Sequence, residues 1–268
     1  MTAIALTIAG SDSAGGAGIQ ADLKTFAALG VHGASAITAL TAQNTLGVEG
    51  VHVVPPEFVT QQIAVVARDL EIGAVKIGML ATSPVIEAVA EGLKLLPGVP
   101  VVLDPVMVAA SGDVLLDKDA IAALKSVLLP RAIVITPNLP EAAQLLGAPQ
   151  ASDEDEMRAQ ARELKRLGAQ AVLIKGGHAK GASSVDLLLD GEGDMRIEAP
   201  RVPTKNDHGT GCTLSSAIAA ELAKGASLRE ATAAGKAYVT AAIGAADELE
   251  IGKGRGPVHH FHAVWPRK

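Results

Sequence analysis

Short apolar runs alternate with longer amphipathic stretches along the whole chain. Six runs are rich in Val, Ile and Leu without polar alternation, which is typical of parallel strands buried on both faces. We expect strands at residues 3–9, 34–40, 74–77, 101–103, 132–135 and 171–174. We expect helices at residues 19–29, 57–70, 84–95, 120–128, 139–146, 154–167, about 213–224 and about 228–248. Residues 185–189 and 196–199 predict a hairpin near a sheet edge.

This alternation of strands and helices predicts an α/β fold with a mostly parallel central sheet and helices on both faces. No Pro-, Gly- or Ser-rich linker, charge run or internal repeat divides the sequence. We therefore expect a single domain over residues 1–268, which is long enough to bury a sizeable core.

The composition narrows the class of protein. The 23 Lys and Arg against 29 Asp and Glu give a formal charge of −6, and a hydrophobic content of 49% excludes intrinsic disorder. The absence of a Lys/Arg-rich run and an aromatic content of 2% argue against a nucleic-acid partner. Cys212 is the only cysteine, so no disulfide can form within the chain. The N-terminal apolar run is about one strand long and lacks a basic flank, which predicts a cytoplasmic protein without a membrane span.

The loops after the expected strands form the candidate site, because ligands of open α/β sheets bind beyond the carboxyl ends of the strands. The first loop, residues 10–18, is rich in glycine, so its backbone N–H groups can approach an anion; a tight turn packed on the sheet is the alternative. It lacks the lysine of a Walker A loop, and no acid lies between Asp22 and Glu49, which weakens a dinucleotide-binding interpretation. After the second strand, Gln43 and Asn44 carry amides able to read the edge of a heterocycle.

Charged side chains follow the later strands. Asp104 ends one strand, and Asn138 and Glu141 follow the next, so the acids could jointly hold a hydrated Mg²⁺ ion. Asn138 and Glu141 also suit the cap and first turn of a helix, and both roles can coexist. Lys175 leaves a buried strand beside two glycines and can reach a phosphate, or be an ordinary solvated lysine.

The most informative segment is residues 207–215 (DHGTGCTLS), which opens a strongly apolar helix. Gly209, Thr210 and Gly211 would offer successive N–H groups to an anion such as a phosphoryl group. Cys212 lies on the first turn, where the helix dipole favours a thiolate, although isolated cysteines are more often small buried hydrophobes. Three histidines at 259, 260 and 262 predict a packed or surface tail rather than a zinc site.

Together these loops resemble the ribokinase-like kinases, and specifically the bacterial hydroxymethylpyrimidine/phosphomethylpyrimidine kinases of thiamine biosynthesis. The resemblance rests on residues 9–13, 15–25, 37–40, 42–45, 76–80, 104–107, 135–141, 175–178 (KGGH), 208–215 (HGTGCTLS) and 256–262 (GPVHHFH). These segments occur in the family's order over nearly the whole chain, which makes a chance match implausible.

The resemblance implies a ribokinase-like fold, a homodimer and a two-step reaction. The γ-phosphoryl group of Mg²⁺-bound ATP would pass to 4-amino-5-hydroxymethyl-2-methylpyrimidine, and a second transfer would give the diphosphate. The implied pyrimidine-binding residues are Gly10, Asp22, Gln43, Met79 and Val106. The implied catalytic residues are Lys175, the anion hole of Gly209, Thr210 and Gly211, and Cys212 as the base. Lys175, Asn138, Thr210 and Gly211 would bind ATP, and Asp104 and Glu141 would hold Mg²⁺.

Two positions depart from the family pattern: Ala110 stands where many relatives have lysine, and Asp207 where threonine is common. Two other hypotheses compete with the pyrimidine kinase. A pyridoxal or pyridoxine kinase of the same fold is the first, although a subset of those enzymes has a second cysteine that this chain lacks. A non-catalytic ligand-binding protein is the second; it would predict a broken anion hole or lost acids, whereas both are intact here.

Overall fold

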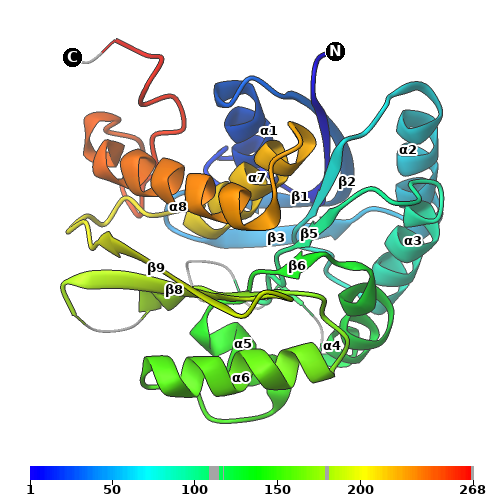
Figure 1. Cartoon of the computed structure of the whole chain (residues 1–268). Coiled ribbons are helices and arrows are strands. Elements are labelled where there is room, and N and C mark those ends of the chain that lie inside the picture. Colours follow the sequence, from blue (N-terminus) through cyan, green and yellow to red (C-terminus); the bar gives the residue numbers. More distant parts are fainter. Residues whose placement is uncertain (109–114, 117, 179–180, 267–268) are drawn as a thin grey trace.

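The centre of the molecule is one mixed sheet (Figure 1). The computed structural model describes residues 1–108, 115–116, 118–178 and 181–266, and within them nine strands lie in the order β3-β2-β1-β4-β5-β6-β7-β8-β9. The strands are β1 (Ile4–Asp12), β2 (His32–Gln43), β3 (Val48–Val53), β4 (Ala74–Ile77), β5 (Val101–Leu103), β6 (Val134–Ile135), β7 (Val172–Ile174), β8 (Ser183–Leu189) and β9 (Asp194–Pro200). Strands β2, β1, β4, β5, β6 and β7 are parallel, and β3, β8 and β9 add antiparallel edges.

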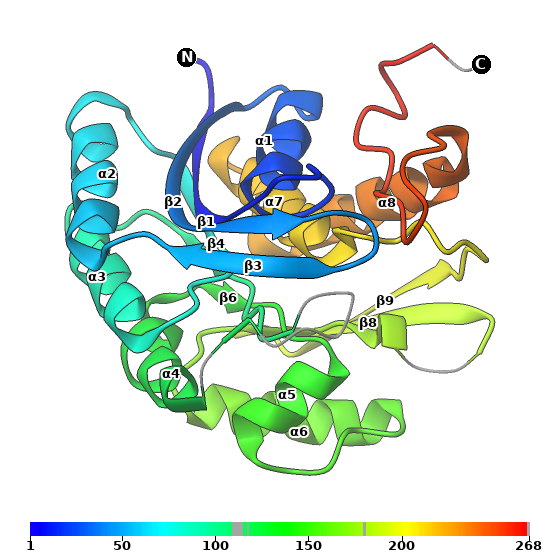
Figure 2. The ribbon, with the colours of Figure 1, turned by 180° about the vertical axis from the view of Figure 1, so that it is seen from behind.

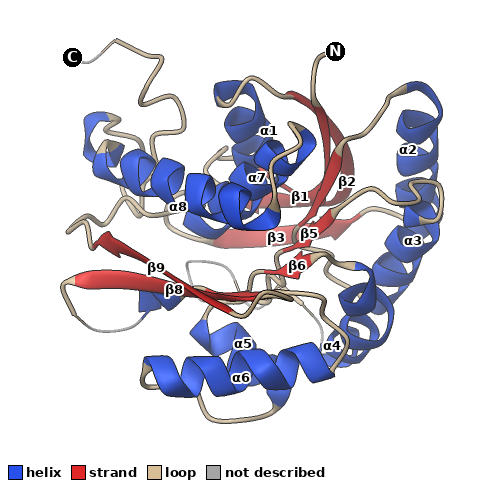
Figure 3. Cartoon of the chain, in the orientation of Figure 1, coloured by secondary structure: helices blue, strands red, loops and turns tan. Residues whose placement is uncertain are grey.

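Helices cover both faces of the sheet, which confirms the expected α/β architecture (Figures 2 and 3). They are α1 (Gly18–Ala28), α2 (Pro56–Asp69), α3 (Ser83–Leu93), α4 (Lys118–Ala123), α5 (Leu139–Leu146), α6 (Glu154–Arg166), α7 (Thr210–Ala223) and α8 (Leu228–Gly244). One core packs α2 to α6 against the sheet, and a second packs α1, α7 and α8 on the opposite face. Within the described residues, no helix is both long and apolar enough to cross a membrane.

Local sequence signals set several helix boundaries. Capping boxes start α5 at Asn138 and α8 at Ser227, and prolines stand in the first turn of α2 and α3. The helix expected at residues 120–128 is only partly regular. After α4 the chain continues through a π-helical turn at Leu124–Leu128 and a 3₁₀ turn at Leu129–Arg131, where a proline cannot extend the α-helical hydrogen bonds.

Strand β3 has no counterpart among the expected strands. It pairs antiparallel with β2 at the sheet edge and is largely exposed, so it carries no continuous apolar run. Glu49, Gly50 and His52 interrupt its hydrophobic pattern. Pairing with β3 also extends β2 beyond the expected end at residue 40, to Gln43.

Glycine is required at residue 18, where the loop after β1 turns into α1. Gly18 has φ +56°, and a Cβ there would lie far inside van der Waals contact of the carbonyl oxygen of Gly10. Gly30 has a similar φ of +74° but open space around it. Comparing alanine substitutions at these two glycines therefore separates the cost of a strained backbone from the cost of a steric clash.

We expect Gly18→Ala to lower the free energy of unfolding by about 2 kcal/mol or more beyond the loss in Gly30→Ala. Gly30→Ala should cost only about 1–2 kcal/mol, the penalty of a left-handed alanine. Urea denaturation of the two variants measures the difference, and equal losses would contradict the steric explanation.

Candidate active site

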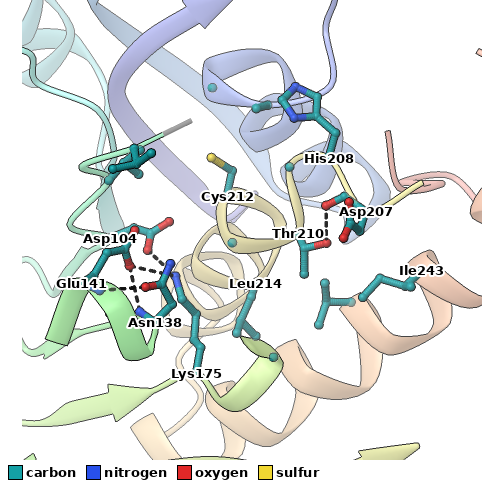
Figure 4. Close-up of a pocket in the computed structure, with 18 of the residues that line it drawn as sticks. Asp104, Asn138, Glu141, Lys175, Asp207, His208, Thr210, Cys212, Leu214 and Ile243 are labelled. Carbon is teal, nitrogen blue, oxygen red and sulfur yellow. Dashed lines mark hydrogen bonds and ion pairs between the residues drawn. The ribbon is translucent and has the colours of Figure 1, made fainter. Parts of the chain in front are cut away.

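The parallel strands end at one edge of the sheet, and the loops beyond them surround a cavity of about 660 Å³. Twelve of the thirteen site residues expected from the sequence line it. They are Gly10, Gln43, Met79, Asp104, Val106, Asn138, Glu141, Lys175, Gly209, Thr210, Gly211 and Cys212. Figure 4 shows how side chains from distant parts of the chain meet there.

Lys175 and Asp104 form an ion pair at the ends of β7 and β5. The Nζ atom of Lys175 lies 2.7 Å from Oδ1 of Asp104, which also accepts a hydrogen bond from Thr136 (3.0 Å). Burial opposes both charges, but the Lys175 ammonium holds the pKa of Asp104 below its usual value, and Asp104 raises the pKa of Lys175. The lysine is thus a fixed cation at the cavity wall.

Glu141 lies beside this pair and completes the cap of α5. Its carboxylate accepts a hydrogen bond from the N–H of Asn138, whose side chain accepts one from the N–H of Glu141 (both 2.8 Å). Lys175 Nζ is 3.9 Å from Glu141 Oε2. Burial, reinforced by the nearby Asp104, raises the pKa of Glu141 to about 7 although Lys175 opposes this. The expected capping role is therefore present, and the carboxylate still faces the cavity.

The two carboxylates have the chemistry that a hydrated Mg²⁺ ion requires. Mg²⁺ takes one or two protein carboxylates and keeps several waters. Among the described residues, no three His, Cys, Asp or Glu side chains form a group that could hold a metal ion. Both acids lie beside Lys175, and a further cation would favour the ionised form of Glu141, which burial and Asp104 disfavour. The residues fit a cation that is also bound by substrate phosphates.

The turn before α7 depends on Gly209. This residue has φ +82°, and a Cβ there would overlap the carbonyl oxygen of Gly16. The donors of Thr210 are already used within the turn, because both its N–H (3.2 Å) and its hydroxyl (2.7 Å) donate to the carbonyl oxygen of Asp207. The N–H groups of Gly211 and Cys212 belong to the first helical turn, where no intrahelical partner exists. Thr210 therefore contributes less to an anion hole than the sequence predicts.

Cys212 is held as a thiol. Burial raises the pKa of Cys212 to about 11, Lys76 opposes the shift, and Asp22 and Asp104 add to it. The expectation that the helix start favours a thiolate is therefore wrong, because burial and nearby acids outweigh the helix dipole.

Asp22 is not among the residues that line the cavity, whereas its partner Lys76 is. Its carboxylate is fully buried and accepts hydrogen bonds from Thr7 (2.6 Å), Ser216 (2.7 Å) and Lys76 (2.9 Å to each oxygen). The structure therefore gives Asp22 a structural bond with Lys76. Its expected contact with the pyrimidine stays a prediction.

Gln43, Met79, Gly10 and Val106 also line the cavity. Met79 packs directly on Gly10, since a Cβ at Gly10 would lie 2.9 Å from the Met79 sulfur. Oε1 of Gln43 accepts a hydrogen bond from the hydroxyl of Thr41 (3.0 Å), and Nε2 of Gln43 lies 3.4 Å from Nε2 of His208.

Three further residues line the cavity without a role predicted from the sequence: Lys76, Asp12 and His208. Asp12 accepts hydrogen bonds from the N–H groups of Gly16 (2.9 Å) and Ala17 (2.8 Å), and its Oδ2 lies 3.0 Å from Nε2 of His208. It therefore links the glycine-rich loop to the turn before α7. The position of Lys76 inside an apolar strand could have pointed to it, because a charge at such a position requires a buried partner.

The remaining expectations concern the tail and the two departures. His259 and His260 are buried, and Nε2 of His260 lies 3.1 Å from Oγ1 of Thr213, so they form part of a packed tail. Asp207 pairs with Arg255 (2.6 Å). Ala110 lies outside the described residues.

Comparison with known proteins gives consistent similarities. Residues 12–259 match the family model described as phosphomethylpyrimidine kinase. A hydroxymethylpyrimidine/phosphomethylpyrimidine kinase of Rhizobium meliloti is 62% identical over 99% of both chains. A thiamine biosynthesis bifunctional protein of Geobacter sulfurreducens is 54% identical over 97% of this chain and 52% of its own length. The structure of a Bacillus subtilis pyridoxal kinase in complex with ADP superposes with a TM-score of 0.91 and 40% identity, covering 99% of this chain and 100% of that one.

Two capping-box glutamates provide a test of the charge at this site. Burial raises the pKa of Glu141 to about 7, whereas the hydrogen bonds from Ser227 hold the pKa of Glu230 below its usual value. A raised pKa stabilises the folded protein at low pH, and this stabilisation is lost as the pH rises from about 4.5 to about 7. Glu141→Gln keeps a capping side chain and removes the titration. Across that range, the free energy of unfolding of wild type should fall relative to Glu141→Gln by on the order of 2 kcal/mol in urea denaturation.

Glu230→Gln is the matched control with the opposite sign. A lowered pKa stabilises the protein above the ordinary glutamate pKa, and the advantage over the variant disappears as the pH falls. If wild type and Glu141→Gln show parallel pH dependences, the raised pKa of Glu141 is refuted.

Proposed function

The chain belongs to the phosphomethylpyrimidine kinase family, and we propose that it phosphorylates 4-amino-5-hydroxymethyl-2-methylpyrimidine with ATP, first to the monophosphate and then to the diphosphate. It is a kinase of thiamine biosynthesis. One observation carries the residue assignments: Gln43 and Met79 share a cavity with Lys175 and with the glycine turn before Cys212. An acceptor and a phosphoryl donor can therefore meet at the start of α7.

We assign the nucleotide to the part of the cavity beside α8. Leu214, Val239 and Ile243 give that part an apolar wall suited to a base. Asn138 and Lys175 line the adjoining part, where a lysine can neutralise phosphate oxygens as a point charge. The γ-phosphoryl group would then point toward Gly211 and Cys212.

Asp104 and Glu141 are assigned to Mg²⁺ through water. When bound, the ion supplies positive charge to the oxygens of the transferring phosphate. Lys175 stays between the two acids and holds its proton, since both acids raise its pKa. The N–H groups at the start of α7 donate to the charge that develops on the phosphoryl oxygens.

Cys212 is assigned to the acceptor hydroxyl in the first transfer. The hydroxymethyl oxygen must lose a proton as it bonds to phosphorus, and a thiolate at Cys212 can take that proton. The acceptor in the second transfer is a phosphate monoester, which is already an anion at neutral pH and needs no base. Because phosphoryl transfer has a loose transition state, positioning and charge dominate the second step.

A homodimer, which rests on the family resemblance, and a cytoplasmic location complete the proposal. Size-exclusion chromatography coupled to light scattering tests the dimer directly.

A pyridoxal kinase is the second candidate. It is favoured by the similarity over the full chain to the pyridoxal kinase structure, which is 40% identical. Pyridoxal also carries a hydroxymethyl group on a heteroaromatic ring, which Met79 could contact in the same way.

The products of the purified protein decide between the two candidates. With Mg²⁺ and ATP, we expect mass spectrometry to show one and then two phosphates added to the hydroxymethylpyrimidine, and little pyridoxal phosphate in a parallel tube. Phosphorylated pyridoxal beside an untouched pyrimidine would reject the proposal in favour of the second candidate.

The two transfers should respond differently to loss of the thiol. We expect Cys212→Ala to slow the first phosphorylation about 100-fold and the second by less than about tenfold, because only the first needs a base. The pyrimidine KM should change by less than about threefold. The pKa of Cys212 is about 11, so the fraction of thiolate still rises throughout the range from pH 6 to pH 9. Over that range the first-step rate of wild type should rise with pH, and the rate of Cys212→Ala should stay flat. Rapid-quench kinetics on each acceptor measures both, and equal slowing of the two steps would reject the base assignment.

A further inference from the structure

Residues 252–260, which we call the C-terminal strap, follow the last helical turn (Ala246–Glu248) and run between two loops of the cavity wall. One of these is the acceptor loop, residues 43–47, which begins with Gln43. The N–H groups of Lys253 and Gly254 donate to Oγ1 of Thr45 (3.2 and 3.1 Å), and that of Arg255 donates to the Thr45 carbonyl oxygen (2.9 Å). Three consecutive N–H groups of the strap therefore bind a residue two positions after Gln43.

The other is the anion-hole loop, residues 206–211. The N–H of His208 donates to the carbonyl oxygen of Gly256 (3.1 Å), and the N–H of Val258 donates to that of His208 (3.3 Å). The N–H of Gly256 also donates to Oδ1 of Asn206 (3.0 Å). The strap thus pairs along the backbone with the residues immediately before Gly209.

Arg255 connects the two sets of contacts. Its N–H binds the acceptor loop, and its guanidinium donates to both carboxylate oxygens of Asp207 in the anion-hole loop (Nε–Oδ1 2.9 Å, Nη2–Oδ2 2.6 Å). The pair also places a positive charge beside a carboxylate that would otherwise repel phosphate near the start of α7. Both side chains line the cavity.

The strap packs closely against both loops. A Cβ at Gly254 would overlap the carbonyl oxygen of Thr45, and one at Gly256 would lie 2.5 Å from Oδ1 of Asn206. Neither glycine has a positive φ, so the requirement at both positions is steric. The strap is therefore in contact with both loops at once.

We propose that the C-terminal strap positions the acceptor loop against the anion-hole loop, with Arg255 as the central positioning residue. The inference rests on the proposed phosphoryl transfer, in which the acceptor hydroxyl must lie in line with the γ-phosphoryl group. Gln43 and His208 are 165 residues apart in the chain, yet their side chains must keep a fixed separation. A misplacement of about 1 Å can cost about 100-fold in rate.

The main test is a double-mutant cycle on Arg255 and Asp207. We expect Arg255→Gln and Asp207→Asn each to lower kcat about tenfold, and the double variant to be within about twofold of either, because both changes break the same link. The KM for ATP should stay within about twofold of the wild-type value.

The control is Arg229→Gln. It breaks a similar pair with Asp190 (2.8 and 2.7 Å) outside the cavity lining and should leave kcat unchanged. These partly exposed pairs contribute little to stability, so the variants should fold.

Two outcomes overturn the proposal. Unchanged kcat in Asp207→Asn beside a slow Arg255→Gln would mean that Arg255 acts directly on a ligand. Equal kcat in Arg255→Gln and Arg229→Gln would mean that the link has no effect. The assays use hydroxymethylpyrimidine and, separately, pyridoxal, and the cycle is read on whichever acceptor wild type phosphorylates. Failure of the pyrimidine assignment is thereby distinguished from failure of the strap.

Gly254→Ala tests the acceptor side independently. We expect it to raise the acceptor KM about fivefold or more with little change in the KM for ATP, whereas Gly244→Ala, at the open end of α8, should match wild type. A folded Gly254→Ala with the wild-type acceptor KM would contradict the positioning role.

Discussion

A buried ion pair between Asp22 and Lys76 ties together four elements at the centre of the molecule. Neither side chain is exposed, and the carboxylate also binds Thr7 of β1 and Ser216 of α7. Breaking such a pair leaves an uncompensated buried charge, which costs about 3–5 kcal/mol. The pair therefore keeps α1, β1, β4 and α7 together. Since Ser216 lies one turn after Cys212, the position of the candidate catalytic thiol depends on this pair.

Two further lysine–aspartate ion pairs line the cavity. Lys175 pairs with Asp104 at 2.7 Å, and Lys236 pairs with Asp186 at 2.8 Å, so each of these lysines has an acid partner. Glu141 is the exception, because it competes with Asp104 for one lysine and burial raises its pKa to about 7. Lys175 supplies a fixed cation, and Glu141 adds a carboxyl group whose ionised form a further cation would stabilise. This is the physical support for assigning Mg²⁺ to that side of the cavity.

The sequence predicts most of the fold because its strands are buried on both faces, and such strands leave continuous apolar runs. Strand β3 escapes detection because it is an exposed edge strand whose existence depends on pairing with β2. The irregular turns after Ala123 escape for a related reason: an apolar helical pattern does not distinguish an α-helix from the π-helical turn that precedes Pro130. Strand pairing and backbone geometry determine the structure at these two places, and the local pattern of apolar residues does not reveal either.

The location of the site follows from the loops, but the use of a charged side chain depends on its partners. Asp22 resembles a substrate-reading acid in the sequence, yet Lys76, Thr7 and Ser216 occupy its oxygens. The cavity lining itself offers the amide of Gln43 and the apolar side chains of Met79 and Val106. Apolar contacts accept a pyrimidine and a pyridine alike, so in the proposed acceptor site discrimination between them depends on hydrogen bonds. Gln43 is one candidate for these bonds, and Thr41 and His208 fix the orientation of its amide.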